Sequence, residues 1–376
     1  MTTISGGRDR SSYRPAVPTI DAHLPTGDPS MHQRLFSPAA AALAALLALT
    51  AATSDAQSNQ ADQAESYRSI GRIERLTDAA ADVFSDDAKI EVLADGLTWC
   101  EGPVWVPDDA GGHLLFSDIP RNTIFRWSAG GGMATFMQPS GYTGVTYYGL
   151  EPGTNGLTLD PQGRLTMCEH GDRRVSVLTR RGGKMTLVDR FEGKRLNSPN
   201  DAVFDKAGNL FFTDPPYGLP QRADDPRREL DFCGVYRLSA DGDLSLLTKE
   251  LDRPNGIGLS PDQKTLYVAQ SDPGRPIWMA YPLGDDGTLG DGKVLMNATQ
   301  FMKEYPGLPD GLAVHPSGLI FGSGPGGIYV MKPSGDLIAR IITGGRTSNC
   351  TFDDTHGTLY ITADDKLCRV KMKAGG

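Results

Sequence analysis

Pro199-Asn200-Asp201, Pro254-Asn255-Gly256 and Pro309-Asp310-Gly311 recur along this chain at a constant interval of 55 residues, from Asn200 to Asn255 and from Asn255 to Asp310. Each tripeptide places a side chain that carries an oxygen directly after a proline and directly before an apolar segment. A fixed period of this kind is typical of a repeat architecture, in which every copy folds into the same small unit. Equivalent positions in successive copies therefore carry a potential metal ligand.

Each copy continues as a predicted β-hairpin, because two apolar runs flank a turn of Asp, Pro, Ser, Lys and Gly residues. The three clearest hairpins span residues 202–212, 257–268 and 312–320, and three weaker copies occur elsewhere in the chain. Further predicted strands at 123–127, 175–178, 235–238 and 327–331 give each copy about four strands, which is the size of one propeller blade. The sequence therefore predicts an all-β fold, a six-bladed β-propeller.

Six side chains that carry oxygen open the predicted blades: Glu101, Asn155, Asn200, Asn255, Asp310 and Asn349. Pairs such as Asn-Gly are common in two-residue hairpin turns. Three of the copies, however, have a proline directly upstream, and proline cannot donate to a strand ladder. We therefore expect these blade-opening side chains in loops that lead into the innermost strands, at the mouth of the central channel.

The blade-opening side chains should form a ring, because the inner strands of a propeller converge on its axis. A ring of two carboxylates and four amides suits a hard cation such as Ca²⁺, whereas Zn²⁺ prefers His and Cys ligands. Two carboxylates balance one divalent ion, and without it their burial would raise a pKa or cost several kcal/mol. The alternative is a polar, water-filled channel in which the asparagines only cap the loops.

The composition suits one large, turn-rich β domain, since the 376 residues include 45 Gly and 26 Pro. The formal net charge is −9 and no basic run occurs, so nucleic acid is not expected as a partner. The five cysteines are Cys100, Cys168, Cys233, Cys350 and Cys368. Their number is odd and their spacing matches no zinc pattern, so buried free thiols are the simplest prediction.

The first 89 residues are expected to lie outside the propeller. A basic start at residues 31–34, an apolar run at 39–52 and the small-residue site Ser54-Asp55-Ala56 predict a signal peptide over residues 31–56. The apolar run has 14 residues, which is too short to span a bilayer; the alternative is an anchor that is never cleaved.

These patterns predict the organisation of the whole chain. Residues 1–30 would be a non-structural leader or belong to a mis-assigned start, and residues 57–89 a linker with one short helix near residues 62–76. The propeller would span residues 90–372. We expect export to the periplasm or the medium, with no stable membrane span after cleavage of the signal.

Five motifs stand out from about residue 90 to residue 372. They are Glu101-Gly102-Pro103-Val104-Trp105, Asn197-Ser198-Pro199-Asn200-Asp201, Phe212-Thr213-Asp214-Pro215-Pro216-Tyr217-Gly218, Arg253-Pro254-Asn255-Gly256 and Pro309-Asp310-Gly311. Together they resemble the family of gluconolactonase, senescence marker protein (regucalcin) and luciferin-regenerating enzyme. The second and third motifs resemble the bacterial gluconolactonases more than the animal branch. The resemblance implies a six-bladed propeller with a divalent ion, usually calcium, in its channel.

The resemblance also implies residue roles. Glu101, Asn200, Asn255 and Asp310 would hold the ion, with Asn155 beside it on the substrate side; Ca²⁺ is expected, and Zn²⁺, Mn²⁺ or Mg²⁺ are possible. The reaction would be hydrolysis of a sugar lactone, in which the ion polarises the carbonyl and stabilises the oxyanion. Asp310 would be the general base or orient the water; the alternative is that it is a ligand only.

The substrate is expected to meet side chains at the channel mouth: Asn155, His170, Arg195 and Tyr217, with Tyr147 as a further candidate. For His170 a hydrogen-bonded structural imidazole is an equal alternative. In the animal branch an arginine stands two residues before the ligand asparagine, where this chain has Ser198, so the sugar specificity of that branch does not carry over.

Two other functions stay open from the sequence. One is metal-dependent hydrolysis of aryl esters or phosphotriesters, and the other is a calcium-binding propeller without catalysis. A serine hydrolase is not supported, because no Gly-x-Ser-x-Gly elbow occurs between a strand and a helix.

Overall fold

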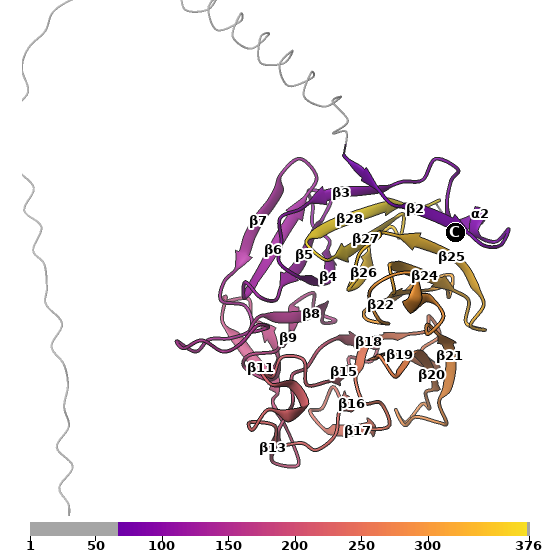
Figure 1. The fold of residues 1–376 in the computed structure, drawn as a ribbon. Coiled ribbons are helices and arrows are strands. Elements are labelled where there is room, and N and C mark those ends of the chain that lie inside the picture. Colours follow the sequence, from indigo (N-terminus) through magenta and orange to yellow (C-terminus); the bar gives the residue numbers. More distant parts are fainter. Residues whose placement is uncertain (1–66, 374–376) are drawn as a thin grey trace, which may run out of the picture. The chain divides into compact units, whose positions relative to one another are not determined.

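Six small antiparallel sheets stand in a ring, and each sheet forms one blade of a β-propeller (Figure 1). The computed structural model describes residues 67–373. Within this range nearly all regular structure is β, so the predicted all-β, six-bladed propeller is confirmed.

The strands of each blade follow one another along the chain. The first blade holds β4 (Cys100–Val106), β5 (His113–Asp118), β6 (Thr123–Ser128) and β7 (Gly132–Met137). The second holds β8 (Thr154–Leu159), β9 (Leu165–Glu169), β10 (Arg174–Leu178) and β11 (Lys184–Val188). The third holds β14 (Ala202–Phe204), β15 (Leu210–Asp214), β16 (Gly234–Leu238) and β17 (Leu244–Thr248). The fourth holds β18 (Pro254–Leu259), β19 (Thr265–Asp272), β20 (Arg275–Pro282) and β21 (Lys293–Asn297).

The last two blades each borrow strands from the start of the described chain. The fifth blade holds β22 (Leu312–Val314), β23 (Ile320–Gly324), β24 (Gly327–Met331), β25 (Leu337–Ile342) and, on its outer edge, β2 (Arg72–Arg75). The sixth holds β26 (Asn349–Phe352), β27 (Thr358–Ala363), β28 (Lys366–Lys371), β3 (Ile90–Ala94) and β1 (Ser69–Ile70). Because β3 pairs with β28, strands from both ends of the described chain close the ring.

The remaining elements are short. A hairpin of β12 (Arg190–Phe191) and β13 (Lys194–Arg195) joins the second and third blades. The helices are α2 (Ala80–Val83) and the 3₁₀ turns η1 (Arg222–Asp224) and η2 (Phe301–Lys303). No helix within residues 67–373 has the length and apolar character needed to cross a bilayer.

The predicted linker and helix before residue 90 are wrong for the part that the structure describes. Strands β1 and β2 occupy residues where the helix near 62–76 was expected, and β2 pairs with β25 from Arg72↔Ile342 to Arg75↔Ala339. Ile70 and Ile73 pack against the core, so pairing and burial outweigh local helix propensity. The propeller therefore begins before residue 90. The predicted leader (1–30) and signal peptide (31–56) lie outside the described residues and stay predictions.

Apolar packing lies mainly between neighbouring blades. Phe211 and Val235 of the third blade share a buried cluster with Ile257 and Val268 of the fourth. The other blade pairs have similar clusters, and one of them joins the fifth blade to the sixth blade, including its strand β3. Each blade therefore depends on its neighbours for burial of its faces. All five cysteines are buried free thiols, as expected.

Closure of the ring can be tested at Ile90, which is 1% exposed at the start of β3 and packs into the cluster between the fifth and sixth blades. Replacing Ile90 with Ala should lower the free energy of unfolding by about 2–5 kcal/mol, because it leaves a cavity in that cluster. Lys89→Ala is the matched control: Lys89 is exposed next door, and its replacement should change stability by less than about 0.5 kcal/mol. Urea unfolding measures both. Equal stability of the two variants would contradict this account of closure.

Candidate active site on the propeller axis

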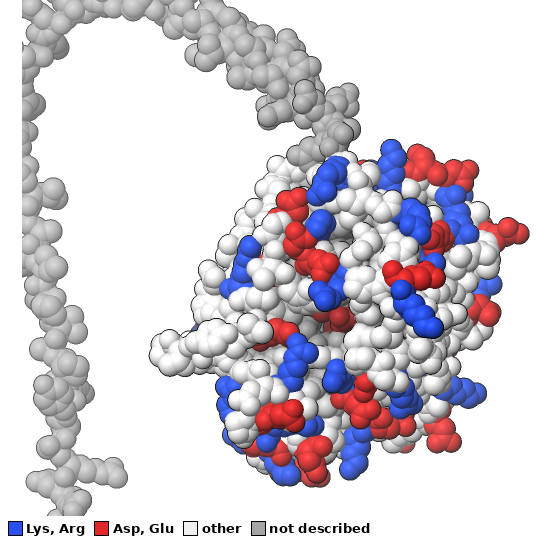
Figure 2. Space-filling view, viewed as in Figure 1, with Lys and Arg blue, Asp and Glu red and all other residues white. Residues whose placement is uncertain are grey.

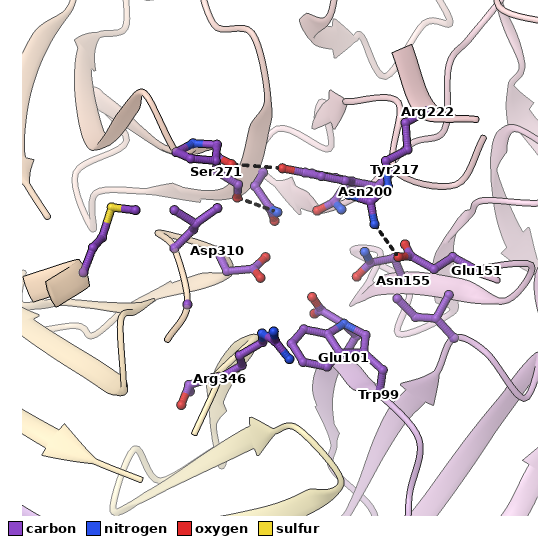
Figure 3. A pocket seen from close by; sticks show the side chains of 17 residues that line it. Trp99, Glu101, Glu151, Asn155, Asn200, Tyr217, Arg222, Ser271, Asp310 and Arg346 are labelled. Atoms are coloured by element: carbon purple, nitrogen blue, oxygen red, sulfur yellow. Dashed lines mark hydrogen bonds and ion pairs between the residues drawn. The ribbon is translucent and has the colours of Figure 1, made fainter. Parts of the chain in front are cut away.

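A cavity of about 370 Å³ lies on the axis where the inner strands begin (Figure 3). Five of the six blade-opening side chains line it: Glu101, Asn155, Asn200, Asn255 and Asp310. In Figure 3 the carboxylates of Asp310 and Glu101 face each other across open space, with Asn155 and Asn200 beside them. The predicted convergence on one axis is therefore confirmed for these five residues. The sixth, Asn349, is buried away from the lining, and its Nδ2 donates to Asp201 Oδ2 (3.3 Å).

Glycine follows most blade-opening side chains because neighbouring inner strands nearly touch there. A Cβ on Gly102, whose φ is +48°, would lie 2.0 Å from the carbonyl oxygen of Asn155, and one on Gly256 would lie 2.3 Å from that of Asp310. The backbone N–H of Gly256 instead donates to the Asp310 carbonyl (3.0 Å). The Asn-Gly and Asp-Gly pairs are therefore contacts between blades rather than hairpin turns. Asn200 and Asp310 lie in loops before β14 and β22, as predicted. The prediction of loops is wrong for the other four, since Glu101, Asn155, Asn255 and Asn349 lie within β4, β8, β18 and β26.

A hydroxyl near the end of the second strand of a blade holds the backbone of the next blade-opening segment. Ser117 Oγ donates to the carbonyl of Asn155 (2.8 Å), Thr213 Oγ1 to that of Asn255 (2.7 Å) and Ser271 Oγ to that of Pro309 (2.5 Å). Each hydroxyl is buried. These bonds fix the position of the ring backbone from one blade to the next.

Aspartates next to two of these hydroxyls hold the loops on the same side. Asp214 accepts hydrogen bonds from the backbone N–H groups of Asn197 and Ser198 (2.7 and 2.8 Å), in the loop that leads to Asn200. Asp118 accepts from Thr98 and Trp99 in the loop before Glu101. The Phe-Thr-Asp motif therefore supports the site from behind rather than lining it.

The asparagine side chains are oriented so that their oxygens are left for the cavity. Asn255 Nδ2 donates to Ser271 Oγ (2.9 Å), which leaves Oδ1 without a partner. Asn155 Nδ2 lies 3.3 Å from His170 Nε2. His170 is fully buried, and burial lowers its pKa to about 3. The ring is therefore neutral and can accept from the Asn155 amide.

The carboxylates carry unbalanced negative charge. Glu101 and Asp201 are buried and Asp310 is half-buried, and none of the three forms an ion pair with a Lys, Arg or His among the described residues. Burial, and then the charge of Asp310, raise the pKa of Glu101 well above its usual range. Burial, and then the charge of Asp201, do the same to the pKa of Asp310. Asp310 Oδ1 is also buried with no hydrogen-bond partner.

These observations fit a divalent cation at this position. The protein supplies two facing carboxylates and an unpartnered carboxylate oxygen, and Arg222 and Arg346, which also line the cavity, form no ion pair with either acid. In residues 67–373, no three His, Cys, Asp or Glu side chains gather in a way that could hold a metal. The amide oxygens of Asn200 and Asn255 would therefore have to complete the ligand set, and an all-oxygen set suits a hard cation.

Tyr217 is the other predicted substrate residue that reaches the cavity. Its ring lines the wall and its hydroxyl donates to the carbonyl of Ser271 (3.2 Å). His170 does not line the cavity but lies behind Asn155, so the alternative of a structural imidazole fits its placement. Arg195 lines a different cavity, since its hairpin turns away from the axis. Tyr147 is 83% exposed on the loop between β7 and β8.

Several residues that line the cavity were not predicted from the sequence. Glu151 and Arg222 come from loops between strands, outside the repeat; Arg222 Nη2 lies 3.6 Å from Glu151 Oε1, and burial raises the pKa of Glu151 to about 7. Ser271 was predictable from a repeated sequence pattern. A hydroxyl stands at the same point of three blades, in Phe116-Ser117-Asp118, Phe212-Thr213-Asp214 and Gln270-Ser271-Asp272. Further lining residues are Trp99, Ile119, Pro273, Met302, Gly307, Leu308, Arg346 and Thr347.

Fold and cavity together define a β-propeller with an acidic, oxygen-lined site on its axis. Comparison with known sequences agrees with this class. Residues 99–365 match the model of the SMP-30/gluconolactonase/LRE-like region, and the chain belongs to this family. The resemblance seen in the motifs is thereby confirmed.

Individual relatives extend over most of the propeller. A gluconolactonase of Zymomonas mobilis is 39% identical over 82% of this chain and 88% of its own length. A solved gluconolactonase structure from Xanthomonas campestris is 34% identical with a TM-score of 0.68, and the match covers 81% of this chain and 99% of that one. A pentonolactonase of Haloferax volcanii is 26% identical over 59% of this chain and 65% of its own length.

The charge on the axis can be tested by removing one carboxylate. In chelator-treated protein, Asp310→Asn should raise the midpoint of thermal unfolding by about 2 °C or more, because it removes a buried negative charge that faces Glu101. Adding a divalent cation should stabilise the wild type by binding the folded state, and should stabilise the variant far less.

Glu151→Gln is the control for this experiment, since it neutralises an acid of the same cavity outside the blade-opening ring. It should keep the wild-type response to the cation. A wild type that does not respond to Ca²⁺, Mg²⁺, Mn²⁺ or Zn²⁺ would contradict a cation site, as would an Asp310→Asn variant that responds fully.

Proposed function

We propose that this protein hydrolyses lactones of sugar acids in the axial cavity. The observation that carries the proposal is Asp310, a carboxylate that faces the cavity with one oxygen free of any hydrogen bond. Its counterpart Glu101 stands across the same space. The gluconolactonase of Zymomonas mobilis, which aligns over most of both chains, supports this substrate class.

We infer that Glu101, Asn200, Asn255 and Asp310 hold one divalent cation, with Ca²⁺ the best match. The support is the chemistry of the donors, since Ca²⁺ takes carboxylate and amide oxygens while Zn²⁺ favours His and Cys. When bound, such a cation polarises a carbonyl and stabilises negative charge on its oxygen. It would also balance the charge that burial leaves on the two acids.

Asp310 would take the proton of the attacking water, or orient that water by accepting its hydrogen bond at Oδ1. A carboxylate next to a cation is a weak base, because the positive charge lowers its pKa. Only moderate assistance is needed, since lactones are activated esters. The general-base role is therefore compatible with a carboxylate that also binds the cation.

The rest of the cavity is suited to a small polyhydroxylated ring. Asn155 offers a polar group and Tyr217 the face of its ring, and the Glu151–Arg222 pair lies at the rim. Trp99 contributes an aromatic face. Sugar rings combine hydroxyl edges with apolar faces, so a wall that alternates polar and aromatic groups can hold one in a fixed orientation.

The reaction can be tested by following acid release on a panel of aldonolactones in a pH-stat, with subtraction of spontaneous hydrolysis. We expect turnover by the wild type that chelator removes and divalent cation restores. Asp310→Asn should lower kcat by at least about 100-fold, the range for loss of a general base, while remaining folded.

Asp354→Asn, an exposed acid on a surface turn, is the matched control and should keep full activity. Unchanged turnover of Asp310→Asn would rule out both roles of that residue. Activity on aryl esters or phosphotriesters but not on lactones would replace the proposed substrate class, and cation binding without turnover on any of them would indicate a binding protein.

Tyr217 should act through its ring rather than its hydroxyl, because the hydroxyl is already bonded to the Ser271 carbonyl. Tyr217→Ala should raise KM by about tenfold, equivalent to about 1.4 kcal/mol of binding energy, with a smaller change in kcat. Tyr217→Phe keeps the aromatic wall, and its KM and kcat should stay within about threefold of the wild-type values, since only the hydrogen bond to the Ser271 carbonyl is lost. Steady-state kinetics on the best lactone measures both, and a larger defect in Tyr217→Phe than in Tyr217→Ala would contradict this role.

A further inference from the structure

A second cavity, of about 760 Å³, lies outside the axial site and shares no lining residue with it. It lies between the loop that joins β7 to β8 and the segments that lead into the third blade. The loop projects from the ring (Figure 1) and forms an almost uncharged projection in Figure 2. The side chains that matter below are Tyr142, Tyr148, Arg173, Arg195, Arg227 and Glu229.

Arg173 is a buried cation without an anionic partner. The residue is only 5% exposed, and no carboxylate of the described residues lies within ion-pair distance of it. Its Nε donates to the carbonyls of Leu196 and Asn197 (2.8 and 3.1 Å), and its Nη1 donates to that of Arg227 (2.8 Å). Its Nη2 is buried and has no partner. A buried charge in this state is costly unless something pairs with it.

Arg195, which is half-buried, supplies a second guanidinium group in the wall of the same cavity. Its Nη2 donates to the carbonyl of Asp172 (2.6 Å), while its Nε is buried without a partner. Both guanidinium groups line the same cavity, and burial, followed by the charge of Arg195, lowers the pKa of Arg173. Among the described residues Arg195, like Arg173, has no ion pair. Two neighbouring cations with free N–H groups are the donor arrangement that an oxyanion fits.

The acidic residues of the cavity wall do not fill this role, because they already have other partners. Asp172 accepts hydrogen bonds from the backbone N–H and the hydroxyl of Thr143 (3.1 and 2.8 Å). Glu229 accepts from the backbone N–H of Arg195 rather than from its guanidinium (2.8 Å). Asp189 pairs with the exposed Arg190.

A purely structural role explains only part of this arrangement. Arg173 Nε holds the carbonyls of Leu196 and Asn197 in the loop leading to Asn200, and Nη1 ties that loop to the carbonyl of Arg227, so Arg173 braces the loop. The brace uses its Nε and Nη1 and leaves Nη2 free. It gives no reason for a second guanidinium alongside, since two like charges in a buried place repel each other.

We propose that this cavity binds the phosphate or carboxylate group of a small anionic molecule, through Arg173 Nη2 and Arg195 Nε. An oxyanion is an acceptor only, so it can take both free N–H groups at once. Tyr142 and Tyr148, whose rings pack 4.7 Å apart, would form the wall next to the rest of the molecule. The site is separate from the axial cavity, and the proposal does not depend on lactone hydrolysis.

The probes for this site are methyl phosphate and acetate, titrated into the complete protein by isothermal calorimetry at low salt. We expect saturable binding of at least one of them, and the tighter probe identifies the anionic group. Arg195→Gln should weaken that binding by about tenfold or more, the change produced by losing one charge-assisted hydrogen bond. Lys194→Gln is the matched control, because Lys194 is exposed on the same β12–β13 hairpin, does not line the cavity and forms no ion pair among the described residues. It should bind as the wild type does.

Two further measurements separate binding from folding. The bound anion should raise the midpoint of thermal unfolding of the wild type and of Lys194→Gln, and should not raise that of Arg195→Gln. If Arg195→Gln does not fold, Arg195→Lys keeps the charge but lacks the Nε–H group, and should show the same weakened binding. The proposal is overturned if neither probe binds the wild type, or if both bind the Arg195 variant as tightly as the wild type.

Discussion

Two carboxylates face each other on the propeller axis, and no basic side chain of residues 67–373 forms an ion pair with either. The architecture around them follows from that constraint. Glu101 and Asp310 come from the first and fifth blades and meet only because the ring closes. In a buried place of low dielectric, like charges repel strongly and the charged form is disfavoured. Packing between the blades must therefore hold together a centre that is destabilising on its own.

The ring backbone is held by bonds between blades, which leaves the side-chain oxygens free. The N–H of Gly156 donates to the carbonyl of Asn200 (2.7 Å), and that of Gly256 to the carbonyl of Asp310. Hydroxyls at the ends of second strands add further bonds to the same carbonyl groups or their neighbours. Since most backbone polar groups are satisfied by other backbone groups and hydroxyls, few side-chain oxygens of the ring are used for folding. Glu101 Oε2 accepts from the N–H of Gly102 (2.9 Å), whereas Asp310 Oδ1 has no hydrogen bond. This is the physical meaning of a preorganised site: the cost of holding the donors together is met by the fold before any ligand arrives.

The repeat made the fold and the centre of the site predictable from the sequence. A period of 55 residues between Asn200, Asn255 and Asp310 implies equivalent positions, and equivalent positions on a closed ring must lie around one axis. Asn349 shows the limit of this argument, because equivalence in the repeat did not place it in the cavity wall. Both polar ends of its side chain are used inside the protein, since Nδ2 donates to Asp201 and Oδ1 accepts from the N–H of Cys350 (2.8 Å), and the spacing of the repeat does not predict these partners.

Residues outside the repeat could not be placed in the same way. Arg195 and His170 were expected at the channel mouth, but their positions in the sequence do not say which way a hairpin turns or which side of a strand end is buried. The helix expected before residue 90 failed for a related reason: the strand pairing of Ile73 with Ile341 is a contact between distant parts of the chain. Local sequence patterns indicate only local conformational preference, whereas tertiary contacts determine the placement of Arg195, of His170 and of the segment before residue 90.

The blade-opening ring and the loops around it differ in how freely their residues can vary. The ring positions come from inner strands that are packed on both sides, so their geometry has little freedom. Glu151 and Arg222 come from connections between strands, and their ion pair spans two such loops at the rim. Because loops can change in length and sequence without disturbing the blades, the same axial carboxylates can serve different substrates when only the rim changes. The identity of the acyl or sugar portion must therefore be sought in these loop residues rather than in the repeat.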